Sequence, residues 1–80
     1  MKSLRSTEQK KLISLLVAAR EKAGLTQQQL AKHLGRPQSF VAKYEGGERR
    51  IDVVEFLAIA RALEMDPARA VRELAAQYAE

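Results

Sequence analysis

Apolar side chains recur along the chain at helical spacing, in five segments separated by short polar stretches. The first segment places Leu12, Leu16, Ala19 and Ala23 on one face, which is the spacing of an amphipathic helix. No segment alternates apolar and polar residues as a half-buried strand would. The pattern therefore predicts an all-α fold.

Residues that favour helix starts mark where the segments begin. Ser6, Thr26 and Asp52 each stand three positions before a Gln or Glu, which is the spacing of a capping box. Pro37 and Pro67 suit the first turn of a helix, where the missing amide proton costs nothing. Glycines follow the first three segments, as expected at helix ends. These signals predict five helices, over about residues 7–22, 27–34, 37–45, 53–63 and 66–78.

Only a short turn, Gly35-Arg36, separates the second and third predicted helices. Two helices joined in this way form a helix-turn-helix, here over about residues 26–45. In that motif the second helix enters the major groove of DNA. If Val41 points inward, Ser39 and Lys43 point outward, and Gln38 lies in the first turn, at the helix end that would meet the base edges. These residues offer a hydroxyl, an ammonium group and an amide.

Charge is divided unevenly along the chain. The first fifty residues carry eleven basic and four acidic side chains, whereas the last thirty carry three and six, and the net charge is +4. A basic front and an acidic back indicate a polyanionic partner on one side of the molecule. Because eighty residues are about half a typical domain length, we expect a single domain over residues 1–80.

The residue content excludes several kinds of site. There is no cysteine and one histidine, His33, so neither a disulfide nor a zinc site is expected. We expect no metal, no cofactor and no small-molecule ligand, and no nucleophile–base pair indicates an enzyme. The apolar run over residues 12–19 is too short to span a bilayer and lacks a cleavage site after it. A cytoplasmic protein without a membrane partner is therefore expected.

Several spaced elements together resemble one known family. The sequence contains AREKAGLTQQQLAKHLGRPQSFVAKYEGGERR followed by VVEFLAIARAL. This is similar to the phage repressor/Cro-like (xenobiotic response element) helix-turn-helix family over about residues 12–64. The resemblance implies a lambda-repressor-like five-helix domain that binds double-stranded DNA and regulates transcription.

The resemblance also implies roles for individual residues. The base-reading residues would be Gln38, Ser39, Lys43 and Phe40. For Phe40 the sequence leaves three possibilities: packing at the edge of the helix pair, contact with a thymine methyl group, or contact with a protein. The phosphate-binding residues would be Gln27, Arg36, Gly47, Arg49 and Arg50. Arg20 and Glu45 would form a structural ion pair.

One reading helix gives limited discrimination, so we expect a homodimer that reads a palindromic operator as a repressor or autoregulator. The C-terminal helix, about residues 66–78, is expected both to close the core and to form the dimer contact. Its apolar stripe comprises Val71, Leu74, Ala75 and Tyr78. A protein-interaction adaptor or an antitoxin-type partner-binding module, in which DNA reading is secondary, is the alternative. A restriction-modification controller and a phage-related regulator also fit the sequence.

Overall fold

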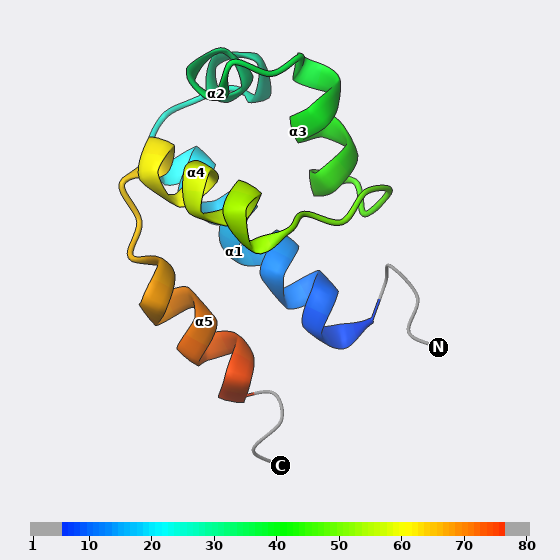
Figure 1. Ribbon diagram of the computed structural model, residues 1–80, viewed down its shortest axis with the longest axis vertical. Helices are drawn as coiled ribbons and strands as arrows, with labels where there is room; N and C mark the ends of the chain where they lie inside the picture. The colour runs from blue at the N-terminus through cyan, green and yellow to red at the C-terminus, as the bar shows by residue number, and fades with distance from the viewer. Residues whose placement is uncertain (1–5, 77–80) are drawn as a thin grey trace.

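The computed structural model describes residues 6–76 and folds them into five helices (Figure 1). These are α1 (Thr7–Lys22), α2 (Gln27–Leu34), α3 (Gln38–Glu45), α4 (Val53–Leu63) and α5 (Pro67–Ala75). The described residues contain no strand, so the predicted all-α, five-helix fold is confirmed. α2 and α3 lie at one end of the long axis and α5 lies toward the other, with α1 and α4 between them (Figure 1).

The predicted capping residues begin four of the helices. The Ser6 hydroxyl accepts a hydrogen bond from a first-turn amide of α1, and Thr26 and Asp52 form complete capping boxes on α2 and α4. The Asp66 carboxylate accepts from the amides of Ala68 and Arg69 on α5, at 3.0 and 3.4 Å. Each such cap satisfies amides that have no partner within the helix.

Pro37 lies one position earlier than predicted. It is the residue before α3, with an extended ψ of 154°, and its side chain makes no capping hydrogen bond. Its carbonyl accepts from the Phe40 amide at 3.0 Å. The proline ring still sets φ to −65°, so Pro37 directs the chain into α3 without belonging to it.

α2 and α4 both end at a residue in the left-handed conformation. Gly35 has a φ of 67°, and Glu64 has a φ of 56°. Glycine adopts this region readily, whereas a residue with a Cβ atom does so at a conformational cost. The turn after α2 is therefore relaxed, and the turn after α4 is strained.

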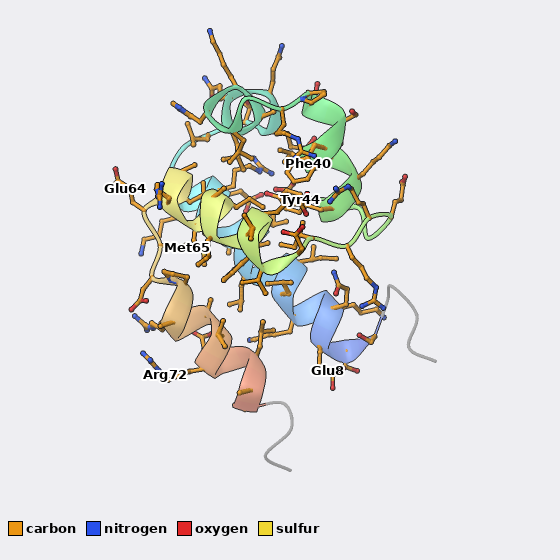
Figure 2. All side chains as sticks on the ribbon, viewed as in Figure 1. Glu8, Phe40, Tyr44, Glu64, Met65 and Arg72 are labelled. Carbon is orange, nitrogen blue, oxygen red and sulfur yellow. The ribbon has the colours of Figure 1, made fainter. Side chains whose placement is uncertain are left out.

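Side chains from all five helices form one core. The largest side chains that are fully buried are Tyr44, Leu16, Leu30, Ile59 and Val41. Figure 2 shows the side chains of Phe40 and Tyr44 directed from α3 into the interior. On α4, Phe56, Ile59, Ala60 and Leu63 lie in the core, whereas Leu57 is 46% exposed.

Candidate nucleic-acid interface

α3 has two contrasting faces. Its inner face buries Phe40, Val41 and Tyr44, and the residues predicted to read bases are exposed: Gln38, Ser39 and Lys43. The last residue of α3, Glu45, is its one acidic residue, and its side chain is 6% exposed. The outward face thus offers hydrogen-bonding groups and a positive charge, with no exposed carboxylate of its own.

An ion pair between Arg20 and Glu45 joins the C-terminal end of α3 to α1. Arg20 donates from Nε to Glu45 Oε2 at 2.8 Å and from Nη2 to Glu45 Oε1 at 3.2 Å. Its Nη1 donates to the Leu25 carbonyl at 2.7 Å. The hydrogen bonds that Arg20 donates to Glu45 raise the pKa of Arg20 above its usual range. Arg20 and Glu45 thus form the pair that the resemblance implied, with both groups largely withdrawn from water.

Two glutamines continue this contact to the outward face of α3. Gln27 Nε2, at the start of α2, donates to Glu45 Oε1 at 2.9 Å. Gln38 Nε2 then donates to Gln27 Oε1 at 3.4 Å. We call this series, Arg20–Glu45–Gln27–Gln38, the relay. The relay connects the side chain of Gln38 to the buried Arg20–Glu45 pair through Gln27. It uses one amide proton of Gln38, so the side-chain oxygen and the second amide proton can bind a ligand.

Phe40 does not belong on the reading face. It is 5% exposed and packs edge-on against Tyr44, with a ring-centroid distance of 5.4 Å. The Arg36 and Arg49 guanidinium carbons lie 4.0 and 4.8 Å from its ring centroid. Of the three possibilities that the sequence left for Phe40, this geometry corresponds to packing at the edge of the helix pair, and the placement of Phe40 among the base-reading residues is corrected, because its ring lies among the core and two arginines.

The same two arginines converge on Glu55 of α4. Arg49 donates from Nη1 and Nη2 to the two carboxylate oxygens at 3.1 and 2.9 Å, and Arg36 Nη1 lies 3.6 Å from Oε2. Hydrogen bonds from Arg49 and from the Asp52 amide lower the pKa of Glu55 to about 2. We call Arg36, Phe40, Arg49 and Glu55 the arginine cluster. Sequence analysis gave Glu55 only a capping role, and its capping-box position was the one signal available.

Gly47 is also placed differently from expectation. It is buried, and a Cβ atom there would lie 3.9 Å from Ile13 Cδ1 on α1. Its amide already donates to the Tyr44 carbonyl at 3.2 Å. A direct phosphate contact by Gly47 is thus contradicted, and its φ of 78° explains the glycine. Arg50, three residues on, is exposed.

A family model described as a helix-turn-helix domain matches residues 14–74. The chain belongs to the helix-turn-helix domain family. The match spans most of the chain and includes α2, the turn and α3.

Among solved structures, this helix-turn-helix domain is similar to an XRE-family like protein from Pseudomonas syringae pv. tomato str. DC3000. The two are 48% identical, the match covers 85% of this chain and 83% of that chain, and the TM-score is 0.80. It is also similar to the restriction-modification controller protein C.AhdI from Aeromonas hydrophila, at 33% identity, 75% and 91% coverage and a TM-score of 0.69. No curated protein matches the chain.

A third similar structure is that of the clp gene regulator ClgR from C. glutamicum. The two chains are 20% identical, the match covers 89% of this chain and 91% of that chain, and the TM-score is 0.77. At that identity it shows the shared fold alone. Together the matches confirm the resemblance to Cro/C1-like helix-turn-helix proteins. The domain is one of DNA-binding regulators and not of enzymes.

α5 of the helix-turn-helix domain buries a different face from the one predicted. Ala70 is its core residue, and Pro67 and Leu74 are half-buried on the same face. Val71 and Ala75 are exposed, and Tyr78 lies outside the described residues. Within residues 6–76, Leu74 is thus the one residue of the predicted stripe that is partly buried. Val71, Leu74 and Ala75 instead line a groove of about 440 Å³ together with Leu12 of α1.

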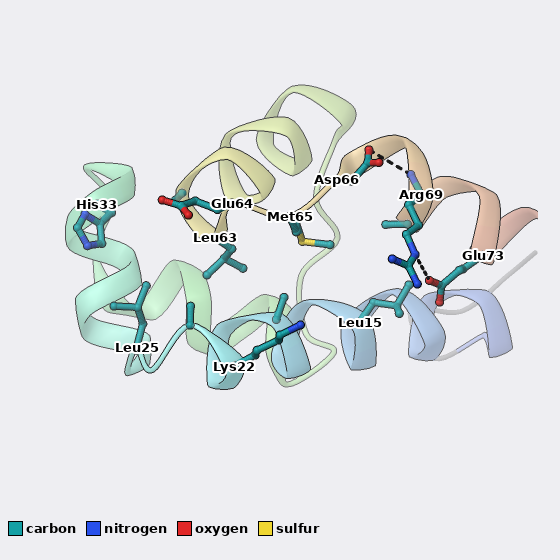
Figure 3. Close-up of a pocket in the computed structure, with 14 residues that line it drawn as sticks. Leu15, Lys22, Leu25, His33, Leu63, Glu64, Met65, Asp66, Arg69 and Glu73 are labelled. Carbon is teal, nitrogen blue, oxygen red and sulfur yellow. Dashed lines mark hydrogen bonds and ion pairs between the residues drawn. The ribbon is translucent and has the colours of Figure 1, made fainter.

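A second groove, of about 740 Å³, lies between α1 and the segment joining α4 to α5 (Figure 3). It carries side chains of both charges, among them Lys22, Glu64 and Arg69, and His33 lies at one end of it. No base-reading residue lines it. Within residues 6–76, no acidic or histidine side chains cluster as a metal site would require, and none of the helices is long and apolar enough to cross a membrane.

Proposed function

We propose that the protein is a homodimeric transcriptional repressor or autoregulator that acts in the cytoplasm and reads a palindromic operator with α3 in the major groove. One observation carries this proposal. The outward face of α3 presents Gln38, Ser39 and Lys43, and Gln38 is restrained by the relay that begins at the buried Arg20. Such restraint lowers the entropy that a side chain loses when it binds.

The orientation of Gln38 suits adenine. Its carbonyl oxygen can accept from adenine N6, and its remaining amide proton can donate to N7. Lys43 can donate to guanine O6 and N7, and Ser39 can bond to any base edge that it reaches. Each good bidentate contact contributes roughly 1–3 kcal/mol of discrimination. The three residues can therefore recognise a short half-site, and a second copy of the chain would double the number of base pairs that are recognised.

The phosphate contacts are proposed for residues around α3. Arg36, Arg49 and Arg50 lie in the turn before it and the loop after it, and Gln27 stands at the first turn of α2. Basic groups at both ends of a reading helix set its register on the duplex without reading sequence. Gly47 and Phe40 are left out of the DNA contacts because both are buried.

The dimer contact is proposed for the exposed apolar side of α5. Val71 is 51% exposed and borders the groove that Leu12 and Leu74 also line. α5 lies away from the end that carries α2 and α3 (Figure 1), so a contact there leaves both reading helices accessible. A two-fold dimer would then read half-sites whose centres are about one helical turn apart or a multiple of it.

The test is selection of bound duplexes from a random DNA library at about 0.15 M salt, where phosphate attraction alone is weakened. An enriched inverted repeat is the expected result. Enrichment of a single half-site would contradict the dimer and retain α3 as a reader. Weak, salt-sensitive binding without enrichment would contradict the proposal and favour an adaptor or antitoxin-type module.

A further inference from the structure

Glu55 of α4 pairs with both Arg36, in the turn before α3, and Arg49, in the loop after it. It receives two hydrogen bonds from Arg49, lies 3.6 Å from Arg36 and accepts from the Asp52 amide at 3.0 Å. We propose that Glu55 stands in for a DNA phosphate at the arginine cluster and that the DNA backbone competes with it for the two guanidinium groups. This inference rests on the proposed function and adds a residue that tunes the strength of sequence-independent binding.

The geometry of the pair is that of phosphate recognition. A guanidinium fork binds a carboxylate and a phosphate through the same two parallel hydrogen bonds. Arg49 uses both terminal nitrogens on Glu55, and one of them also donates to the Arg50 carbonyl at 2.7 Å. The fork that would grip a phosphate is therefore already filled by an anion of the same chain.

The arginines nevertheless reach solvent. Their side chains are 40% exposed for Arg36 and 37% for Arg49, whereas that of Glu55 is 17% exposed. Both guanidinium carbons also lie within 5 Å of the Phe40 ring centroid, a cation–π contact that does not involve Glu55. A phosphate can thus approach the outer edges of guanidinium groups that are already oriented, while the carboxylate behind them offsets one of their two charges.

Two effects of Glu55 on DNA binding have opposite signs. The carboxylate orients Arg49, which favours binding, and it cancels positive charge, which opposes binding. Because the Phe40 ring and the Arg50 carbonyl also orient Arg49, we infer that the charge effect is the larger. The cluster then carries a net charge of about +1 in place of +2, and its attraction for the DNA backbone is reduced.

The experiment compares the Glu55→Gln variant with the wild type over a range of salt concentrations. Glutamine keeps an acceptor oxygen for Arg49 and can complete the capping box, so the change removes mainly the charge. We expect affinity for all duplexes to rise about fivefold at 0.15 M salt, the factor for releasing one more counterion. The plot of log affinity against log salt should steepen by about one unit.

Glu73→Gln is the matched control. Glu73 pairs with Arg69 on α5 at 3.7 Å, so this variant changes the net charge equally but away from α3. It should leave the salt dependence almost unchanged. In an Arg49→Gln background, the gain from Glu55→Gln should shrink. Circular dichroism at the assay temperature would show that each variant is folded.

Three outcomes would overturn the inference. Unchanged affinity in Glu55→Gln would mean that the arginines bind no phosphate, and weaker affinity would mean that Glu55 acts by positioning Arg49. An equal gain in Glu73→Gln would assign the effect to net charge alone. All three presuppose that the wild type selects a DNA sequence, so failure of that selection is a separate result and concerns the proposed function.

Discussion

Gln38 links the proposed DNA contact to the core through a series of side-chain hydrogen bonds. Its side-chain amide donates to Gln27, which donates to Glu45, which accepts from Arg20. Each link is a hydrogen bond to a group that is itself held in place. A reading residue supported in this way has its amide orientation determined before DNA arrives.

Gln38→Ala should remove the base preference at one position of each half-site and leave weak, sequence-independent binding. The expected loss is about 1–3 kcal/mol for the preferred duplex, and almost none for a random one, because phosphate contacts are retained. Competition titrations with duplexes altered at that position would measure it. Gln28→Ala, at an exposed position of α2 outside the relay, is the control, and an equal loss in both variants would remove Gln38 from the reading set.

Glu55 should make stability depend on pH in the acid range. Its hydrogen bonds from Arg49 and the Asp52 amide lower its pKa from 4.5 to about 2. A lowered carboxyl pKa stabilises the folded state above pH 4.5, and this contribution is lost as the pH falls from 4.5 toward 2. Melting temperatures between pH 7 and 2 should therefore fall more steeply in the wild type than in Glu55→Gln. Parallel curves would contradict this assignment.

The residue roles that depend on local sequence were predictable, and those that depend on packing between helices were not. Gln38, Ser39 and Lys43 are exposed because the periodicity of α3 requires it. Phe40 lies next to Ser39 in the sequence, yet two arginines and Tyr44 enclose it. That enclosure depends on how α4 approaches α3, for which the sequence carries no local signal.

At the scale of elements, the turn after α4 contains stored conformational strain. Glu64 occupies the left-handed region with a φ of 56°, where the turn after α2 uses Gly35. For a residue with a Cβ atom, adopting that conformation costs about 1–2 kcal/mol of conformational free energy. The helix ends there all the same, because the Glu64 and Met65 amides close the last turn onto the Arg61 and Ala60 carbonyls.

Glu64→Gly should therefore stabilise the fold. Relief of the strain is offset in part by the greater freedom of glycine in the unfolded chain, which costs about 0.4–1 kcal/mol. A net gain of about 0.5–1 kcal/mol is expected in the free energy of unfolding, measured by urea denaturation. Glu64→Ala removes the same charge but retains the strain. Equal gains in the two variants would show that charge, and not backbone conformation, is responsible.

The helix boundaries followed closely from the sequence, because caps are local. α1, α2 and α4 have the predicted limits, and α3 begins one residue later than predicted. α5 was the least well predicted. Its apolar residues suggested a face through Val71, Leu74, Ala75 and Tyr78, whereas Ala70 is buried, Leu74 is half-buried, and Val71 and Ala75 are exposed. A helix with few large apolar residues does not by itself determine which side faces the core.

At the scale of the whole molecule, the two helices proposed to contact DNA and the helix proposed to form the dimer lie toward opposite ends, although Arg50 lines the groove beside α5. The structure extends over 37 × 25 × 20 Å, with α2 and α3 toward one end of the longest dimension and α5 toward the other (Figure 1). α5 itself carries Arg69, Arg72 and Glu73, whereas Asp52 and Glu55 lie at the start of α4, so the acidic excess of the last thirty residues is not gathered at the α5 end.

Val71→Lys should dissociate the proposed dimer. A charge placed on a buried apolar contact must lose its hydration, so association should weaken at least tenfold, as measured by sedimentation equilibrium. Affinity for the palindromic duplex should fall with it, while affinity for a single half-site should be nearly unchanged.

Val54→Lys provides the comparison, because Val54 is 76% exposed on α4 together with Val53 and Leu57. Lysine at this position should leave the dimer intact if α5 forms the contact. Dissociation by Val54→Lys and not by Val71→Lys would instead assign the dimer contact to α4.

The relay reaches the outward face of α3 at a single residue. Within residues 6–76, no hydrogen bond or ion pair joins the side chain of Ser39 or of Lys43 to the rest of the protein, whereas the side chain of Gln38 is linked to Arg20 through two intermediates. Under the proposed function, operator preference can therefore diverge between related proteins through substitutions at Ser39 and Lys43 without loss of stability. Gln38 would meanwhile preserve the alignment of each new protein on its DNA. In this proposal the fold holds the residue that aligns α3 on DNA, Gln38, whereas Ser39 and Lys43, which help to set the preferred sequence, can be substituted separately.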